Sequence, residues 1–381
     1  MAKVVPSSEG PKFKKPVPTD PPLLEFDPAY LKRKAELPEQ IFHLKSGKQL
    51  AYFTEGNKGD PAVVCFPSAG FGKWQFIPRE SIPGIYLVAV DDMGHGNSSP
   101  LEKCPVFSES VEEVEELLNA LEIEKFYVFG HSRGGAHALQ ISAALPERAL
   151  GCATLGTPIT IKHPSFSKQD VKDLDPHGAL KAFNANGCFG GCLRHMTKNL
   201  YYYPDKTKDF GFAGWSYGGY KYYISKECGG APKEMQKDLF FVTKILDSEL
   251  HGSNSKMGLL YEMMGLFGEW SFDLAAIKCP TFVYHGMNEE VPLPHAKMFN
   301  KLIPNSELII FPEHGHVSEM MEFEKIVVGL VQGKSVKAAT IDFILSILCV
   351  EIARNGLCSL GGDIYDFVEE AEKWGMLLEI L

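Results

Sequence analysis

Short, continuous apolar segments recur along the chain and alternate with helical patterns. These segments are residues 63–66, 85–90, 126–129, 153–155, 281–285 and 307–311. Strands that lack polar alternation are buried on both faces, which is typical of parallel sheets covered by helices. The sequence therefore predicts an α/β fold built on a mainly parallel sheet that is flanked by helices.

Two local patterns predict elements at the margins of this sheet. Residues 41–55 alternate around Lys45-Ser46-Gly47-Lys48, which predicts a hairpin with a tight turn. Apolar residues at helical spacing predict a helix over residues 111–121, and Ser110 with Glu113 matches a capping box at its start.

The strand and helix alternation is interrupted once along the chain. It stops after Pro158, and the next strand pattern is the segment at 281–285. We therefore expect a core made of residues 39–158 and 274–332, with a mostly helical unit inserted at 159–273.

Both ends of the chain differ in character from this core. Residues 1–38 are rich in proline and poor in apolar residues, which predicts a disordered tail. Residues 333–381 have apolar residues at helical spacing, which predicts a helical extension. That extension either packs on the core or forms the contact of a homodimer.

Charge and cysteine content exclude several classes of protein. The chain carries 38 basic and 48 acidic residues, a formal charge of −10, which is the wrong sign for binding nucleic acid through its phosphates. The nine cysteines are scattered, without the density of a disulfide framework, so we expect a reducing, cytoplasmic location. The apolar stretch 343–350 is too short to span a bilayer, so we expect no integral membrane segment.

The most informative motif is Gly130-His131-Ser132-Arg133-Gly134, which lies between an apolar strand and a helical segment. In this context Gly-x-Ser-x-Gly is the pattern of a nucleophile elbow, a sharp turn that exposes the serine hydroxyl. The alternative is a tight turn in which Ser132 only caps the helix. A nucleophilic serine needs a histidine base and an acid that orients this base, so the hypothesis requires both partners elsewhere in the chain.

With this motif, three further segments resemble the α/β-hydrolase superfamily. They are Asp91 to Ser98, similar to the family's Asp-x-x-Gly-x-Gly-x-Ser loop, Leu145 to Arg148, and Trp270 to Asp273. The resemblance covers about residues 41–158 and 270–330. It implies a serine-nucleophile member in which the insertion forms a cap.

The insertion contains aromatic and methionine side chains that would either line a substrate pocket or form the cap's own core. They are Trp215, Tyr220, Met257, Met263, Met264 and Phe267, with Trp270 at the exit of the cap.

The resemblance also implies a triad in the chain order serine, acid, histidine. His316 occupies the position of the family's Gly-His motif, and His314 is the neighbouring candidate for the base. Glu289 stands three residues after Gly286, where the family usually has an aspartate. The other candidates for the acid are Glu290 and, after the preceding strand, Asp170, Asp173 and Asp175. His95, His137 and His285 are expected to be structural.

An oxyanion hole needs two backbone N–H donors. The elbow geometry assigns one to Arg133, directly after the nucleophile. The second is expected in the loop Pro67-Ser68-Ala69-Gly70, where we assign the N–H of Ala69 because proline has none. Ser68 is either a hydroxyl donor to the site or an ordinary turn residue.

These residues predict a serine hydrolase that cleaves a small or medium carboxylic ester through an acyl-enzyme. The alternatives are carbon–carbon bond cleavage, lyase or perhydrolase chemistry on the same triad, and a non-catalytic receptor of the same fold. Relatives with Gly-His-Asp-Arg-Gly open epoxides through a carboxylate, which Ser132 cannot replace. Cys188, Cys192 and His195 lack a fourth zinc ligand, so we expect no metal and no cofactor.

Overall fold

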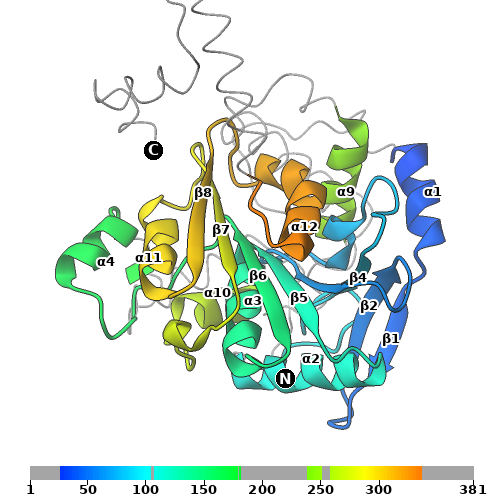
Figure 1. Cartoon of the computed structure of the whole chain (residues 1–381), viewed down its shortest axis with the longest axis horizontal. Helices are drawn as coiled ribbons and strands as arrows, with labels where there is room; N and C mark the ends of the chain where they lie inside the picture. The colour runs from blue at the N-terminus through cyan, green and yellow to red at the C-terminus, as the bar shows by residue number, and fades with distance from the viewer. Residues whose placement is uncertain (1–25, 104–106, 179, 182–237, 251–257, 337–381) are drawn as a thin grey trace, which may run out of the picture. The chain divides into compact units, whose positions relative to one another are not determined.

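The computed structural model describes residues 26–103, 107–178, 180–181, 238–250 and 258–336. At its centre is an eight-stranded sheet in the order β1-β2-β4-β3-β5-β6-β7-β8 (Figure 1). The strands are β1 (Gln40–His43), β2 (Gln49–Glu55), β3 (Ala62–Phe66), β4 (Tyr86–Val90), β5 (Phe126–His131), β6 (Ala149–Leu155), β7 (Thr281–Gly286) and β8 (Ser306–Phe311).

The strands from β4 to β8 in this order are parallel to one another. β2 runs in the opposite direction, so it pairs antiparallel with both β1 and β4. The hairpin of β1 and β2 closes at Gly47, whose φ of 84° suits a glycine in a tight turn. Each predicted apolar segment falls within a strand or overlaps one, and the residues of β3 and β4 in the middle of the sheet are all buried. The predicted mainly parallel α/β sheet is confirmed.

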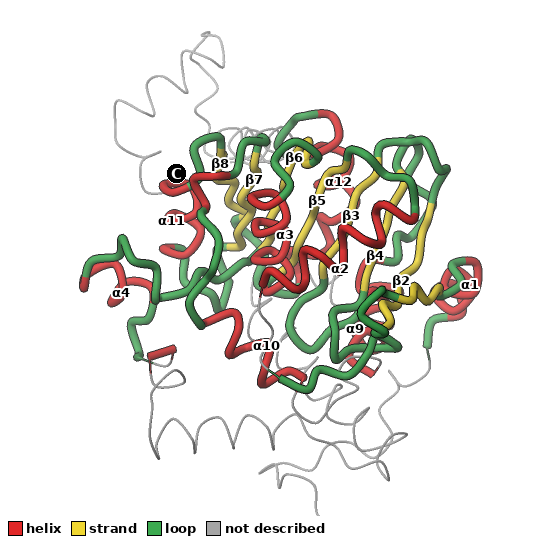
Figure 2. The backbone as a smooth tube through the Cα atoms, turned by 90° about the horizontal axis from the view of Figure 1, so that it is seen from below, coloured by secondary structure: helices red, strands yellow, loops and turns green. Residues whose placement is uncertain are grey.

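Helices cover both faces of the sheet (Figure 2). One face carries α2 (Phe107–Ala120), α3 (Arg133–Ala144) and α11 (Pro294–Leu302), and the other carries α12 (Phe323–Gln332). Beneath α12, the rings of Phe76, Phe129 and Phe323 pack against one another at centroid distances of 5.2–5.9 Å. Burial of these apolar side chains is the main stabilising contribution to such a core.

Helix α2 begins earlier than its sequence pattern predicts. Because it starts at Phe107, Ser110 lies inside the helix and does not cap it. The Ser110 hydroxyl instead lies 2.9 Å from Nδ1 of His137 on α3. The capping-box interpretation was therefore wrong, and the serine serves a contact between two helices.

Part of the tail predicted at residues 1–38 is helical instead. Pro28–Glu36 forms helix α1, which begins with Asp27 as the N-cap and Pro28 in the first turn. The fully buried ring of Tyr30 packs edge-on against Phe240 at 5.4 Å, and its hydroxyl donates to Asp247 at 2.8 Å. The partners of α1 lie about 200 residues away on α9 (Leu239–Leu250), so the local sequence could not reveal them (Figure 1).

The described parts of the insertion 159–273 contain helices and loops. The helices are α4 (Lys168–Leu174), α9 and α10 (Gly258–Phe267), followed by the short helix η5 (Leu274–Ala276). Trp215, Tyr220 and Met257 lie outside the described residues, as do the cysteines at 188 and 192 and His195. The residues from 337 onward also lie outside them, so the extension and its dimer contact stay predictions. Within the described ranges, no helix is long and apolar enough to cross a membrane.

Candidate active site

Ser132 lies at the sharp turn between β5 and α3. Its backbone angles, φ 53° and ψ −121°, fall in a region that costs a non-glycine residue about 1–3 kcal/mol. The chain segments around the turn approach very closely, since a Cβ added at Gly134 would lie 2.0 Å from the carbonyl oxygen of Phe66. This strained turn at the carboxyl edge of the sheet has the geometry of a nucleophile elbow.

His316 follows β8 and faces the serine. Its Nε2 lies 3.0 Å from Oγ of Ser132, and its Nδ1 hydrogen-bonds to Oε1 of Glu289. His314, the other candidate for the base, turns to Glu322 instead, with Nε2 and Oε1 3.6 Å apart. The structure therefore brings together Ser132, His316 and Glu289.

Glu289 follows β7, and its side chain is 1% exposed. Its neighbour Glu290 is exposed. The three aspartates after β6 are engaged elsewhere: Asp170 accepts from the N–H of Ser167 at 2.8 Å, Asp173 from Gln169 at 2.7 Å, and Asp175 from the N–H of Lys181 at 2.8 Å. Of the carboxylates proposed from the sequence, Glu289 is the one that hydrogen-bonds to His316.

Charge and burial oppose each other in this pair. Burial disfavours the charged forms, but the carboxylate of Glu289 and its hydrogen bond raise the pKa of His316 above its ordinary value. Burial likewise acts to raise the pKa of Glu289, and the attraction to His316 outweighs it, so this pKa is lowered. The arrangement thus favours an ionised Glu289 that stabilises a proton on His316.

His131, the residue before Ser132, links two loops of the site. Its Nε2 donates to the carbonyl oxygen of His316 at 2.8 Å, so its Nδ1 is the acceptor that faces the Ser68 hydroxyl and, at 3.1 Å, Nε2 of Gln75. Burial and the positive charge of His316 lower the pKa of His131 to about 3. His131 is therefore a neutral, structural histidine.

The loop after β3 lies against the start of α3, where the two expected oxyanion donors belong. The N–H of Ser68 donates to Gln75 at 3.2 Å, and its hydroxyl contacts His131, so Ser68 is engaged within the loop. Ala69 follows it, and Arg133 supplies the first backbone N–H of α3. The close approach of Gly134 to Phe66 and Pro67 brings these two segments side by side.

The side chain of Arg133 joins a buried charged network beneath the site. Its Nη1 pairs with Asp92 and lies 3.0 Å from Oε1 of Glu262 on α10, whose Oε2 accepts from the N–H of Gly70 at 3.2 Å. Burial raises the pKa of Glu262 to about 8, while Arg133 keeps the pKa of Asp92 low despite burial. Glu262 thus contacts both Arg133 and the oxyanion loop.

The remaining histidines beside this network are neutral. His95 lies 3.1 Å from Glu262, and burial lowers its pKa to about 4. Burial also lowers the pKa of His137 to about 4, and that of His285 falls for the same reason. A small cavity borders Arg133 and His137, but Ser132 and His316 are not among its lining residues, so we do not assign the substrate to it.

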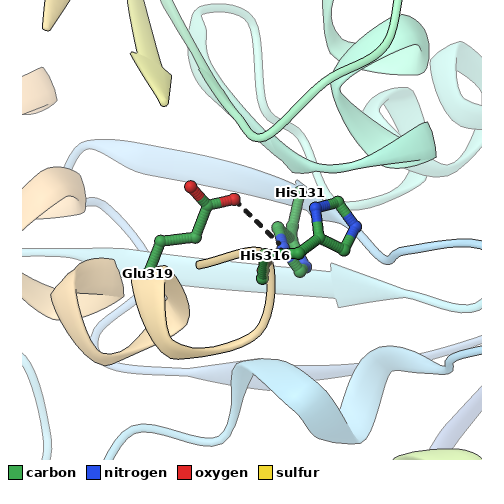
Figure 3. Close-up of side chains that lie close together, drawn as sticks. All are labelled: His131, His316 and Glu319. Atoms are coloured by element: carbon green, nitrogen blue, oxygen red, sulfur yellow. Dashed lines mark hydrogen bonds and ion pairs between the residues drawn. The ribbon is translucent and has the colours of Figure 1, made fainter. Parts of the chain in front are cut away.

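His131, His316 and Glu319 form a cluster whose ligating atoms lie within 4.8 Å of one another, close enough to hold one ion (Figure 3). Hydrogen bonds already engage the histidines, because Nε2 of His131 donates to a carbonyl and both ring nitrogens of His316 face triad partners. An ion would have to displace these bonds. We therefore assign the cluster to the triad.

Sequence reasoning did not identify three residues that surround the triad: His131, Glu262 and Glu319. Glu262 carried a usable signal, because it is the one charged residue in the apolar helix Gly258–Phe267. Within that helix, Phe267 is buried beside Leu266 and Ala136 of α3, so it packs where the insertion meets the core. Nothing in the local sequence marked His131 or Glu319.

Comparisons with known proteins agree with the fold. A family model described as alpha/beta hydrolase fold matches residues 62–320. Bifunctional epoxide hydrolase 2 of Sus scrofa is 29% identical over 138 residues, which are 35% of this chain and 24% of that protein. The AB hydrolase superfamily protein YisY of Bacillus subtilis is 25% identical over 252 residues, which are 64% of this chain and 79% of that protein. The match to the epoxide hydrolase thus spans about a quarter of its length.

A solved structure extends this likeness to the three-dimensional fold. Bromoperoxidase from Bacillus anthracis aligns with a TM-score of 0.57 and 15% identity, over 77% of this chain and 100% of that chain. At such identity the likeness concerns the fold alone. Because the family model spans most of the chain, and the sheet order and elbow agree with it, the chain belongs to the alpha/beta hydrolase family.

Proposed function

We propose that this hydrolase cleaves small or medium carboxylic esters through an acyl-enzyme on Ser132, with His316 as the base and Glu289 as the acid. The observation that carries the proposal is the contact of His316, 3.0 Å from the serine Oγ through Nε2 and hydrogen-bonded to a buried carboxylate through Nδ1. A serine hydroxyl is a weak nucleophile without such a base.

The first half of the reaction forms the acyl-enzyme. Nε2 of His316 takes the proton of Ser132 as Oγ attacks the ester carbonyl carbon, and the negative charge moves to the carbonyl oxygen. The tetrahedral intermediate collapses, the bond to the leaving alcohol breaks, and the imidazolium of His316 returns its proton to that alcohol. Glu289 stabilises the imidazolium during this step.

Water completes the cycle by the same route. His316 takes a proton from water as the hydroxide adds to the acyl carbon. Collapse then breaks the bond to Oγ and releases the acid, and His316 returns the proton to Oγ of Ser132. In both halves we assign the negative oxygen to the backbone N–H groups of Ala69 and Arg133. One such donor contributes on the order of 3 kcal/mol to transition-state stabilisation.

Ester cleavage is favoured over the activity named for the epoxide hydrolase relative. That activity would need a carboxylate nucleophile in the elbow, and this chain has the hydroxyl of Ser132 there. Carbon–carbon bond cleavage, lyase and perhydrolase chemistry use the same triad, and no described contact favours them over ester hydrolysis.

The natural substrate is a small molecule whose size is set by residues of the insertion.

A panel of p-nitrophenyl esters of increasing acyl length tests the proposal, with Ser132→Ala as the inactive reference. We expect turnover by the wild type that falls beyond a medium acyl length. Equal rates for the wild type and Ser132→Ala would contradict the proposal, and a folded wild type inactive on every ester would favour the receptor alternative.

We further propose a reducing, cytoplasmic location. Cys65, Cys152 and Cys279 support it, because they are buried free thiols in the described part of the chain. The net charge of −10 argues against a nucleic-acid partner.

A further inference from the structure

Glu319 lies behind the proposed triad, on the short helix η6 (Ser318–Glu322), and its side chain is fully buried. Figure 3 shows this side chain extending toward His131 and His316. A carboxyl group in such a place must either be paired with a cation or carry a proton, because an isolated buried carboxylate is very costly.

The contacts of Glu319 indicate where its proton lies. Its Oε2 accepts from the N–H of Gly286 at 3.1 Å. Its Oε1 lies 3.5 Å from Nε2 of His131, but that ring is neutral and donates to the carbonyl of His316. Because Oε2 accepts an N–H bond, Oε1 is the oxygen on which a proton of this carboxyl group would lie.

Glu289 lies next to that oxygen. A side-chain hydrogen bond joins Glu289 and Glu319, and a Cβ added at Gly156 would lie 2.0 Å from Oε1 of Glu319 and 2.7 Å from Oε2 of Glu289. Two carboxyl groups hydrogen-bond to each other only if one of them holds a proton. Glu289 is the ionised partner because its other oxygen pairs with His316.

We propose that Glu319 is a positioning residue of the triad: its protonated carboxyl group donates a hydrogen bond to Glu289 and holds that carboxylate against His316. This inference rests on the proposed function. A glutamate has one more rotatable bond than an aspartate, so a glutamate in the acid position needs a second anchor to keep one orientation. Glu289 has one anchor at each oxygen, His316 at Oε1 and Glu319 on the other side.

The titratable groups around this pair come from three strands or the loops that follow them. They are His131 from β5, His285 and Glu290 from β7 and its loop, and His316 from the loop after β8. Both His131 and His285 have lowered pKa values because they are buried, so neither supplies a positive charge to Glu319 at neutral pH.

Two variants separate positioning from simple packing. Glu319→Gln keeps a donor for Glu289 and an acceptor for Gly286, so we expect kcat within about threefold of the wild type. Glu319→Ala removes the anchor, and we expect kcat to fall about 10- to 100-fold with little change in KM, the range expected for a hydrogen bond to a charged group. The partly exposed Glu322, on the same short helix, provides the control Glu322→Gln.

The pH profile supplies the readout that packing would not move. Without a hydrogen bond from residue 319, the carboxylate of Glu289 pairs less often with His316 and raises the pKa of this histidine less. The acidic limb of kcat/KM should therefore shift to lower pH in Glu319→Ala and keep its position in Glu319→Gln. Equal losses in both variants would mean that an ionised Glu319 is needed and would overturn the inference. A Glu319→Ala enzyme with unchanged kcat and acidic limb would overturn it as well.

Infrared difference spectroscopy tests the proton without any turnover. The wild type should show the C=O stretch of protonated carboxyl groups at pH 7. Glu319→Gln should lose part of this band, since the protonated Glu262 still contributes to it, and Glu322→Gln should keep the whole band. A spectrum unchanged by Glu319→Gln would contradict the inference, even if Glu319→Ala failed to fold. If Glu319→Gln lost part of this band but the wild type had no esterase activity, the proposed function would fail while the protonated Glu319 stood.

Discussion

The hydroxyl oxygen of Ser132 lies 3.0 Å from Nε2 of His316, although 184 positions separate the two residues along the chain. The parallel sheet makes this possible because β5 and β8 end at the same edge, so the residues after each strand meet there. Glu289, after β7, completes the constellation from the strand between them.

Glu289→Gln should lower kcat on the order of 10³- to 10⁴-fold, because the amide can neither fix the His316 tautomer in the same way nor stabilise its charge. Glu290→Gln, one residue on, should change kcat less than about threefold.

The pH profile of Glu289→Gln gives a second readout. Glu289 raises the pKa of His316, and the base must be neutral to act, so the acidic limb of kcat/KM should move to lower pH in Glu289→Gln. Similar, small losses in both variants would move the acid elsewhere.

Gly156→Ala should abolish most activity, because the added methyl group would collide with Glu319 and Glu289 and would lie 3.0 Å from Nδ1 of His316. Gly178→Ala is the matched control: its φ of 69° is also left-handed, but nothing lies within 4 Å of the added Cβ. Gly178→Ala should lose about 1 kcal/mol of stability from backbone strain, and Gly156→Ala should lose more because the collision adds to that strain, both measured by urea unfolding. Normal kcat in folded Gly156→Ala would argue against the packing of the triad described above.

Glu262→Gln should change how stability depends on pH. The pKa of Glu262 is raised to about 8 in the folded protein, against about 4.3 when unfolded, so the folded state binds the extra proton. The contribution of Glu262 is full below pH about 4.3 and is lost as the pH rises through about 8. The difference in Tm between Glu262→Gln and the wild type should therefore become more positive from pH 5 to 8 and then level off. A difference in Tm that stays constant from pH 5 to 8 would contradict this prediction.

Tyr30→Ala should destabilise the protein by about 3–5 kcal/mol, because it removes a fully buried ring and its hydrogen bond to Asp247. Leu31→Ala, next in the same helix, should cost less than about 0.5 kcal/mol, since Leu31 is 48% exposed. Urea unfolding of the two variants compares them directly. Equal stabilities would mean that α1 does not contribute to the folded core.

The sequence predicted those features that depend on local pattern. The buried strands follow from runs such as 126–129, and Ser132 follows from the elbow, whose glycines are needed for close approach. His316 and Glu289 were proposed from the motif and the resemblance, and the structure places His316 beside Ser132 and Glu289 beside His316. The choice between Glu289 and Glu290 could not be made from spacing alone, since both are in one turn.

What the sequence did not predict depends on contacts between distant segments. Tyr30 belongs to a proline-rich segment, and its burial becomes visible only when α9 lies beside it. Ser110 has the spacing of a cap, but three earlier residues join the helix, and its hydroxyl pairs with His137. Glu319 carries no motif, because its partners Gly286 and Glu289 come from β7 and the loop that follows it, about 30 residues earlier in the chain.

The most direct test of the central claim is covalent labelling of Ser132 by a fluorophosphonate, read by mass spectrometry of the modified peptide. The wild type should be labelled at Ser132, and Ser132→Ala should not be labelled. The His316→Asn variant should react at least about 100-fold more slowly, because the hydroxyl of Ser132 then lacks a base. A folded wild type that takes up no label, or a label that persists at another residue in Ser132→Ala, would contradict the assignment of Ser132 as a nucleophile activated by His316.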